Sequence, residues 1–283
     1  MNLIKCTICE YTRLRPWGER NGYKLYRCLS CTHKFADLKN QEMSRGDPER
    51  FREEFTHGLM SSDEKYYEHL AAGEAGGNAT AITTEHILDI CRNNELEFSG
   101  SWLDIGCGSG FLLSQVQNAG FKAQGIEPGG WGQIAATSKG VQVAQGFLTS
   151  DTFAQRFDVV SATDVVEHIP DPVEFLRLMA GYVVPSGHII ISIPFADSLE
   201  AKLMGSSWDM VEPPTHCQFF SMQSLKLALQ MADLELVDNR QFNIRNLRGL
   251  LRQVYLRQLF DVLLPGPQLV CLIKKSQPTH QIK

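Results

Sequence analysis

Residues 103–111 read L-D-I-G-C-G-S-G-F, a stretch whose residue types suit ligand binding by the main chain. Three of them are glycines: Gly106, Gly108 and Gly110. Because glycine has no Cβ, a ligand can lie directly on this backbone. Apolar residues at 102–105 predict the end of a buried parallel strand, and residues 111–116 predict the start of a helix. A strand that leads through such a turn into a helix presents backbone N–H groups and the positive helix end to a ligand.

The spacing of these glycines excludes one of the two ligand classes that use such a turn. A dinucleotide site needs G-x-G-x-x-G, and the third glycine position counted from Gly106 is Phe111. The stretch instead resembles motif I of the class I S-adenosylmethionine (SAM)-dependent methyltransferases. The resemblance implies that Asp104 precedes the turn and that the glycines pass beneath the methionine end of SAM.

Two later segments resemble further SAM-binding positions of the same family. Residues 123–126 predict the second strand, and Glu127 follows it, where a carboxylate can accept both hydroxyls of a ribose. Glu127 is similar to the acidic residue of motif II. Phe147 follows a predicted strand at 141–144 and occupies the place where the family lines its adenine pocket.

The fourth predicted strand, residues 157–162, runs into T-D-V-V-E-H-I-P-D-P. This stretch resembles the family's post-strand-four motif, in which L-E-H-x-x-D-P is frequent among small-molecule methyltransferases; a valine replaces the usual leucine here. Asp164 ends the strand, at the crevice where open α/β sheets bind ligands, and we expect it to contact SAM. Glu167 and His168 are neighbours on a helical turn and are not expected to face each other. We expect them to hold the turn and the crevice wall.

Residues 208–221, W-D-M-V-E-P-P-T-H-C-Q-F-F-S, contain the candidate catalytic base. They are similar to the H-x-x-F-F-S element of zinc-ribbon methyltransferases that act on deoxysugars, in which the histidine is assigned to acid–base chemistry. Imidazole titrates near neutrality, so His216 can take a proton from a substrate hydroxyl or an activated carbon. The alternative is a histidine that only fixes its loop.

Four cysteines near the N-terminus have the spacing of a zinc ribbon. Two C-x2-C pairs are separated by eighteen residues, and they supply Cys6, Cys9, Cys28 and Cys31. Tetrahedral zinc bound by four thiolates keeps no open position, so we expect a structural Zn²⁺. His33 follows Cys31 by two residues and is expected to be a bystander, because all four zinc positions are filled.

The ribbon carries a positive charge that the rest of the chain does not. Residues 1–39 contain eight basic and three acidic side chains, whereas the whole chain of 283 residues has a net charge of −5. One interpretation is an ordinary solvated surface. The other is a contact for phosphate, on a nucleotide-linked substrate or on RNA.

The sequence contains no apolar signal run at its start and no eighteen consecutive apolar residues. We therefore expect no secretory or membrane-spanning segment and a location in a reducing cytoplasm. Such a compartment favours metal binding over disulfides for clustered cysteines.

Alternating strand and helix patterns from residue 102 onward predict an α/β fold with helices on both faces of a mostly parallel sheet. The resemblance implies a Rossmann-like class I methyltransferase sheet with an antiparallel last strand. The expected organisation is a zinc ribbon at 1–39, a linker or helical lid at 40–79, a methyltransferase domain at 80–275 and a tail at 276–283. Residues 243–264 predict an inserted basic amphipathic helix, which covers the core or binds a membrane, a partner or an anionic substrate.

The combined motifs imply SAM-dependent methyl transfer to a small molecule. The favoured acceptor is a sugar or sugar nucleotide of polysaccharide or natural-product biosynthesis. One alternative is an rRNA or tRNA methyltransferase, although the chain is acidic overall and lacks an N-P-P-Y motif. The other is a non-catalytic SAM-binding protein that docks through its ribbon and its basic helix. The sequence leaves the acceptor atom, the oligomeric state and the pathway open.

Overall fold

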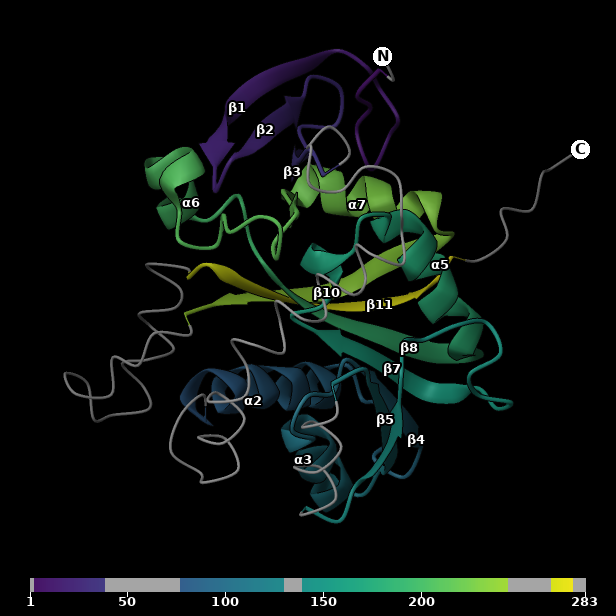
Figure 1. Cartoon of the computed structure of the whole chain (residues 1–283). Coiled ribbons are helices and arrows are strands. Elements are labelled where there is room, and N and C mark those ends of the chain that lie inside the picture. The colour runs from purple at the N-terminus through teal and green to yellow at the C-terminus, as the bar shows by residue number, and fades with distance from the viewer. Residues whose placement is uncertain (1–2, 39–76, 130–138, 244–265, 277–283) are drawn as a thin grey trace, which may run out of the picture.

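The computed structural model describes residues 3–38, 77–129, 139–243 and 266–276 (Figure 1). Most of the linker or lid predicted at 40–79 lies outside these ranges, and its last three residues begin helix α2 (Gly77–Asn93). The basic helix predicted at 243–264 and the tail at 276–283 also lie outside the described residues, apart from one residue each.

A seven-stranded sheet forms the centre of the described chain, in the order β10-β11-β8-β7-β4-β5-β6. Its strands are β4 (Ser101–Ile105), β5 (Lys122–Glu127), β6 (Gln142–Gln145), β7 (Phe157–Thr163), β8 (Val183–Pro194), β10 (Leu234–Phe242) and β11 (Gln268–Lys275). The pairs from β6 to β8 are parallel, whereas β11 is antiparallel to both β8 and β10. The predicted fold class, mostly parallel with an antiparallel last strand, is confirmed.

Each strand sends alternate side chains to opposite faces, which creates two apolar layers. In β4, Trp102 packs with helices α2 and α3 (Phe111–Ala119), while Leu103 packs with helices α5 (Pro172–Tyr182) and α7 (Met222–Met231). Figure 1 shows these two pairs of helices on opposite faces of the sheet. Because the strands from β6 to β8 are parallel, their carboxyl ends lie at the same edge of the sheet, where ligands of such sheets bind.

The helices of the described chain begin and end at residues with a local physical reason. Gly110 (φ 69°) and Gly120 (φ 118°) bound α3 in left-handed conformations. Asp171 accepts a hydrogen bond from the Glu174 N–H at the start of α5, and Ser221 caps α7 in the same way. None of the described helices has the length and apolar character that a bilayer-spanning helix requires.

Strand β8 contains an irregularity near its start. Residues 184–187, V-P-S-G, are typical of a turn in composition, but they lie within β8, which begins at Val183. The pairing with β7 moves from Phe157↔Val183 to Val159↔His188, so β8 has three more residues than β7 over this interval. Residues 184–187 therefore form a wide irregularity inside one strand.

The N-terminal ribbon is joined to the main body by its own sheet. Strands β1 (Leu14–Arg20), β2 (Tyr23–Cys28) and β3 (Lys34–Ala36) are antiparallel, and β3 pairs with β9 (Gln218–Phe219) from the C-terminal half. Figure 1 shows this sheet above α7. Three of the four cysteines, together with Phe35, belong to the same apolar cluster as the central strands. The ribbon therefore shares its core with the sheet.

Candidate active site

The glycine turn between β4 and α3 has the backbone that only glycine adopts without strain. Gly106, Gly108 and Gly110 have φ angles of 67°, 49° and 69°. A Cβ placed on Gly106 would lie 2.6 Å from the Cγ2 atom of Val165, in the turn that follows β7. The motif I turn and the post-strand-four turn are therefore in van der Waals contact.

Asp104 lies directly before this turn and is 1% exposed. Its Oδ1 accepts a hydrogen bond from the Ser161 hydroxyl (2.6 Å), which in turn accepts one from the indole N–H of Trp102 (2.7 Å). Its Oδ2 has no hydrogen-bond partner among the described residues. Burial raises the pKa of Asp104 to about 7, and the charge of Glu127 adds to the rise. A cationic ligand group at Oδ2 would satisfy this carboxylate.

Glu127 ends β5 beside the glycine turn, as predicted. Its Oε2 accepts the backbone N–H of Gly108 (3.0 Å) and its Oε1 accepts that of Gly129 (2.9 Å). A carboxylate oxygen has two lone pairs and can accept more than one hydrogen bond. Phe147 follows β6, at the outer end of the sheet, and 46% of its surface is exposed.

Asp164 is placed differently from the other two acidic residues. It has a left-handed backbone (φ 54°) at the end of β7, and its Oδ1 accepts a hydrogen bond from the side-chain amide of Gln268 on β11. That amide also donates to the hydroxyl of Ser192 on β8 (2.8 Å). The Asp164 carboxylate therefore lies toward β8 and β11, on the opposite side of β7 from β4 and Asp104. Its contact with SAM stays a prediction.

The structure brings His216 against Glu167 and His168, which lie in the short turn η2 (Val166–His168). The two imidazole rings meet edge to face with centroids 4.7 Å apart, and the Nε2 of His168 lies 4.0 Å from the Oε1 of Glu167. Glu167 and His168 thus approach each other, contrary to the sequence prediction, because both side chains converge on the His216 loop. The potential ligand atoms of the three residues lie within 4.8 Å of one another, close enough to exchange a proton or to approach one cation.

Burial sets the ionisation of this cluster. It lowers the pKa of His216, against the opposing effects of the Met210 carbonyl and the charge of Glu212. It lowers the pKa of His168 to about 4, with His216 adding to the shift. Burial and the charge of Asp164 raise the pKa of Glu167 well above its ordinary value, and neither oxygen of Glu167 has a hydrogen-bond partner among the described residues. Both imidazoles are therefore uncharged near pH 7.

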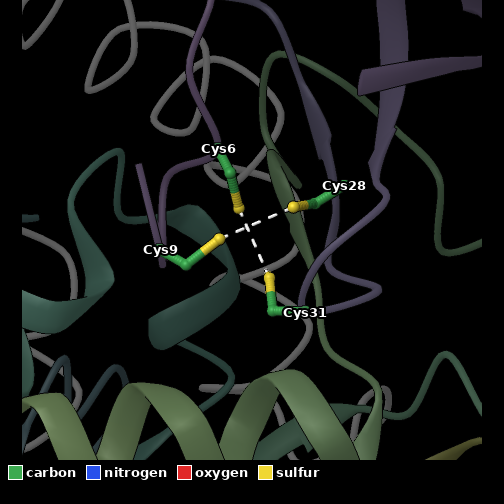
Figure 2. Close-up of side chains that lie close together, drawn as sticks. All are labelled: Cys6, Cys9, Cys28 and Cys31. Atoms are coloured by element: carbon green, nitrogen blue, oxygen red, sulfur yellow. Dashed lines mark hydrogen bonds between the residues drawn. The ribbon is translucent and has the colours of Figure 1, made fainter. Parts of the chain in front are cut away.

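The four predicted metal ligands converge on one centre (Figure 2). The Sγ atoms of Cys6 and Cys31 are 3.5 Å apart, as are those of Cys9 and Cys28. These separations exclude a disulfide and are near the ~3.8 Å edge of a tetrahedron with metal–sulfur bonds of about 2.3 Å. A hydrogen bond from Cys31 holds the pKa of the Cys6 thiol well below its usual range, which favours a thiolate. The four residues fit a closed metal site.

A family comparison decides the class of the protein. The model of a methyltransferase domain matches residues 79–239, which is more than half of the chain. The chain belongs to the methyltransferase family. This assignment agrees with the strand order, with the acidic residue Asp104 in β4 and with the glycine turn that follows β4.

Solved methyltransferase structures share the fold. An SAM-dependent methyltransferase from Thermotoga maritima superimposes with a TM-score of 0.54 at 15% identity, covering 79% of this chain and all of that chain. One from Clostridium acetobutylicum gives 0.50 at 14% identity, covering 77% and 99%. At this level of identity the likeness concerns the class I fold alone.

Curated relatives match a shorter segment of this methyltransferase. The ubiquinone biosynthesis O-methyltransferase of Aeromonas salmonicida is 36% identical over 98 residues, which is 32% of this chain and 41% of the relative. The enzyme of the same name from Serratia proteamaculans is 34% identical over 103 residues, or 34% and 43%. The chain therefore spans about two fifths of the length of the curated relatives that it matches.

The structure gathers some of the predicted site residues and adds others. Asp104, the three glycines and Glu127 lie together at one edge of the sheet, and His216 lies across the post-strand-four turn from them. Sequence reasoning missed Ser161, which orients Asp104, and Gln218, which is described below. The pairing of β4 with the predicted strand β7 sets Ser161 opposite Asp104 and could have indicated its role. No local pattern indicates the role of Gln218.

We expect Gly106→Ala to weaken SAM binding about tenfold or more, because its new Cβ would collide with Val165 and displace the turn. Gly140→Ala is the matched control. It has nearly the same φ (70°), but no atom of the described residues lies within 4 Å of its added Cβ. Calorimetric titration with SAM compares the two variants, and equal losses of affinity would refute the collision.

Proposed function

We propose that this protein transfers the methyl group of SAM to a hydroxyl of a small-molecule acceptor and that His216 accepts the proton released. One observation carries the proposal: the glycine turn touches, through Val165, the same short turn whose Glu167 and His168 meet His216. A ligand-binding backbone and a neutral imidazole therefore lie on two sides of one loop. The reaction is placed in a reducing cytoplasm, as the cysteine usage suggests.

The residues that fit SAM are acidic side chains and glycines at the ends of the parallel strands. The unpartnered Oδ2 of Asp104 suits the amino group, Glu127 suits the ribose hydroxyls, and the glycine turn admits the ligand to the backbone. Bound SAM supplies an electrophilic methyl group on a sulfonium whose positive charge disappears during transfer. Catalysis then depends on in-line positioning and on removal of the acceptor proton.

His216 is prepared to remove that proton. Its Nδ1 lies 2.8 Å from the carbonyl oxygen of Met210, an interaction that requires the proton on Nδ1. In the neutral ring, Nε2 then carries the lone pair. Because burial lowers the pKa of His216, the ring stays in this accepting form at neutral pH.

The names of the curated relatives support an oxygen acceptor, since they are O-methyltransferases. The H-C-Q-F-F-S and E-H-I-P-D-P elements support a sugar or sugar nucleotide as the acceptor.

A row of cations across the ribbon further supports a nucleotide-linked acceptor. The strand register sets Arg15 opposite Arg27 and Arg27 opposite Lys34. Directly opposed like charges are unfavourable, and among the described residues none of the three forms an ion pair, so the row suits an anionic ligand such as a diphosphate.

We expect Arg27→Gln to weaken the binding of inorganic pyrophosphate about tenfold, because it removes the middle charge of the row. Arg13→Gln is the control, since Arg13 is an exposed ribbon cation outside the row. Calorimetry at fixed low salt compares them. Equal effects of the two changes would mean that the ribbon offers only diffuse charge.

We assign Zn²⁺ to the four-cysteine site, because four thiolates in a tetrahedral arrangement with no open position are typical of structural zinc. Native mass spectrometry should find one zinc ion per chain. Loss of the metal without loss of structure would contradict a structural role.

The first experiment is calorimetric titration of the purified protein with SAM, followed by transfer of labelled methyl groups to pools of acceptors. We expect micromolar SAM binding and labelling of phenols or sugar nucleotides. Labelling of RNA, with binding that weakens steeply with salt, would instead favour the RNA methyltransferase suggested by the basic ribbon. A folded, zinc-loaded protein that does not bind SAM would refute the proposal.

A further inference from the structure

Gln218 is the residue at which the ribbon, the His216 loop and the post-strand-four turn meet. It is 2% exposed. Its Oε1 accepts hydrogen bonds from the Thr7 hydroxyl (2.8 Å) and from the Nε2 of His33 (2.9 Å). Its Nε2 donates to the carbonyl oxygens of Ile169 (3.1 Å) and Pro170 (3.2 Å). A side-chain amide has two acceptor and two donor positions, so all of them are used.

The ribbon side of this junction consists of the metal-binding turns themselves. Thr7 lies between Cys6 and Cys9, and His33 follows Cys31 by two residues. His33 is fully buried, with its Nδ1 3.2 Å from the Ser224 hydroxyl at the start of α7. It was expected to be a bystander; the structure shows that it is no metal ligand but connects the second cysteine pair to the catalytic domain. One side chain from each cysteine turn, Thr7 from the first and His33 from the second, therefore donates to the same amide oxygen.

The other side of the junction is the candidate catalytic cluster. The backbone N–H of Cys217 donates to the carbonyl oxygen of Glu167 (2.9 Å), and the Nδ1 of His168 lies 2.8 Å from the carbonyl oxygen of Thr215. The residues immediately before and after His216 are thus bound to η2. The carbonyl of Cys217 in turn accepts the N–H of Ala36 from the ribbon (3.0 Å). The loop that carries His216 is thus bound to η2 on one side and to the ribbon on the other.

We propose that Gln218 is a positioning residue through which the four-cysteine ribbon fixes His216 against Glu167 and His168. The inference rests on the proposed role of His216 in catalysis. Metal binding orders the two cysteine turns, these turns fix the Gln218 amide, and the amide fixes both the His216 loop and the segment after η2. The ribbon then contributes to the positioning of His216 in the active site.

Gln218→Met tests this directly, because methionine has a similar volume and forms none of the four hydrogen bonds. We expect kcat to fall about tenfold, with SAM affinity and metal content unchanged. The matched control is Gln223→Met. Gln223 also lies between the ribbon and α7, where it accepts from Thr32 (3.3 Å) and donates to Ser30 (3.5 Å), but it does not contact the His216 loop. An equal fall of kcat in both variants would refute the positioning role.

A second pair of variants isolates the ribbon's contribution and keeps the test open if Gln218→Met does not fold. Thr7→Val removes only the hydroxyl that donates to Gln218, and Thr7→Ser restores it. We expect Thr7→Val to lower kcat about threefold and Thr7→Ser to return it to the wild-type value. If valine and serine behave alike, the ribbon does not act through this bond.

A spectroscopic measurement separates this inference from the proposed function. In ¹⁵N-histidine NMR spectra, the ring signals of His216 are identified by their loss in His216→Ala. We expect them to move in Gln218→Met and to stay in place in Gln223→Met. If His216→Ala retains full activity, its catalytic role fails while the coupling still stands. Unmoved signals in Gln218→Met would overturn the coupling itself.

Discussion

Cys28→Ser is expected to lower the melting temperature of the whole protein by about 10 °C or more, in a single transition. Serine does not replace a thiolate ligand, and the binding free energy of a structural metal is folding free energy. Cys28 is fully buried and belongs to the same apolar cluster as the central strands. A loss of about 4 kcal/mol corresponds to this shift for a domain of this size.

The cause of the shift is the continuity between the ribbon and the sheet. Strand β3 pairs with β9, and Phe35 packs in the core that α5 and α7 cover. An unfolded ribbon would expose that core and break the hydrogen bonds of His33 and Gln218. We therefore expect the methyltransferase domain to unfold together with the ribbon, in one transition.

Cys91→Ala is the control, because Cys91 is a fully buried thiol in α2 outside the metal site. Burial raises its pKa to about 12, so it remains a neutral, apolar side chain. We expect a loss of about 1 kcal/mol, or a few degrees. Calorimetry follows both variants and the wild-type protein with a chelator. Two separate transitions in Cys28→Ser, with the second at the wild-type temperature, would show that the ribbon folds on its own.

The contrast between the cysteines and Gln218 shows what local sequence can predict. Two C-x2-C pairs specify a tetrahedral site by themselves, because each pair forms a tight turn with two thiolates. The environment of His33 and Gln218 depends on the pairing of β3 with β9, which joins segments 185 positions apart at the His33–Gln218 contact. Neither segment carries a signal for that pairing, so the role of His33 was not predictable.

The same reasoning explains which parts of the candidate catalytic cluster could be predicted. The ends of β4 and β5 were predicted because apolar runs end there at glycine or at an acidic residue. The parallel pairing of these two strands then brings Asp104 and Glu127 to the same edge of the sheet. Glu167 and His168 were judged on helical geometry alone, which ignores a third residue from elsewhere. The loop that carries His216 draws both side chains together, and only its fold reveals this arrangement.

His216→Ala is expected to lower kcat about 100-fold or more while SAM affinity changes less than about twofold. General-base catalysis contributes factors of about 10² to 10⁴. The substitution removes the Nε2 lone pair, whereas Asp104, Glu127 and the glycine turn keep their geometry. His188→Ala is the matched control: this histidine lies on β8, paired with Val159 and Lys274, and contacts no residue of the cluster.

The pH dependence gives this prediction its sign. A base must be unprotonated, so kcat should be constant above about pH 6.5 and should fall on the acid side of that value, because burial places the pKa of His216 below its ordinary one. The residual activity of His216→Ala should lose this acid limb. A variant that retains the limb would assign the titration to another group, and the imidazole of His168, with its pKa near 4, would titrate at clearly lower pH. Loss of the acid limb in His216→Ala therefore identifies the base, whereas a limb that persists in this variant would exclude His216.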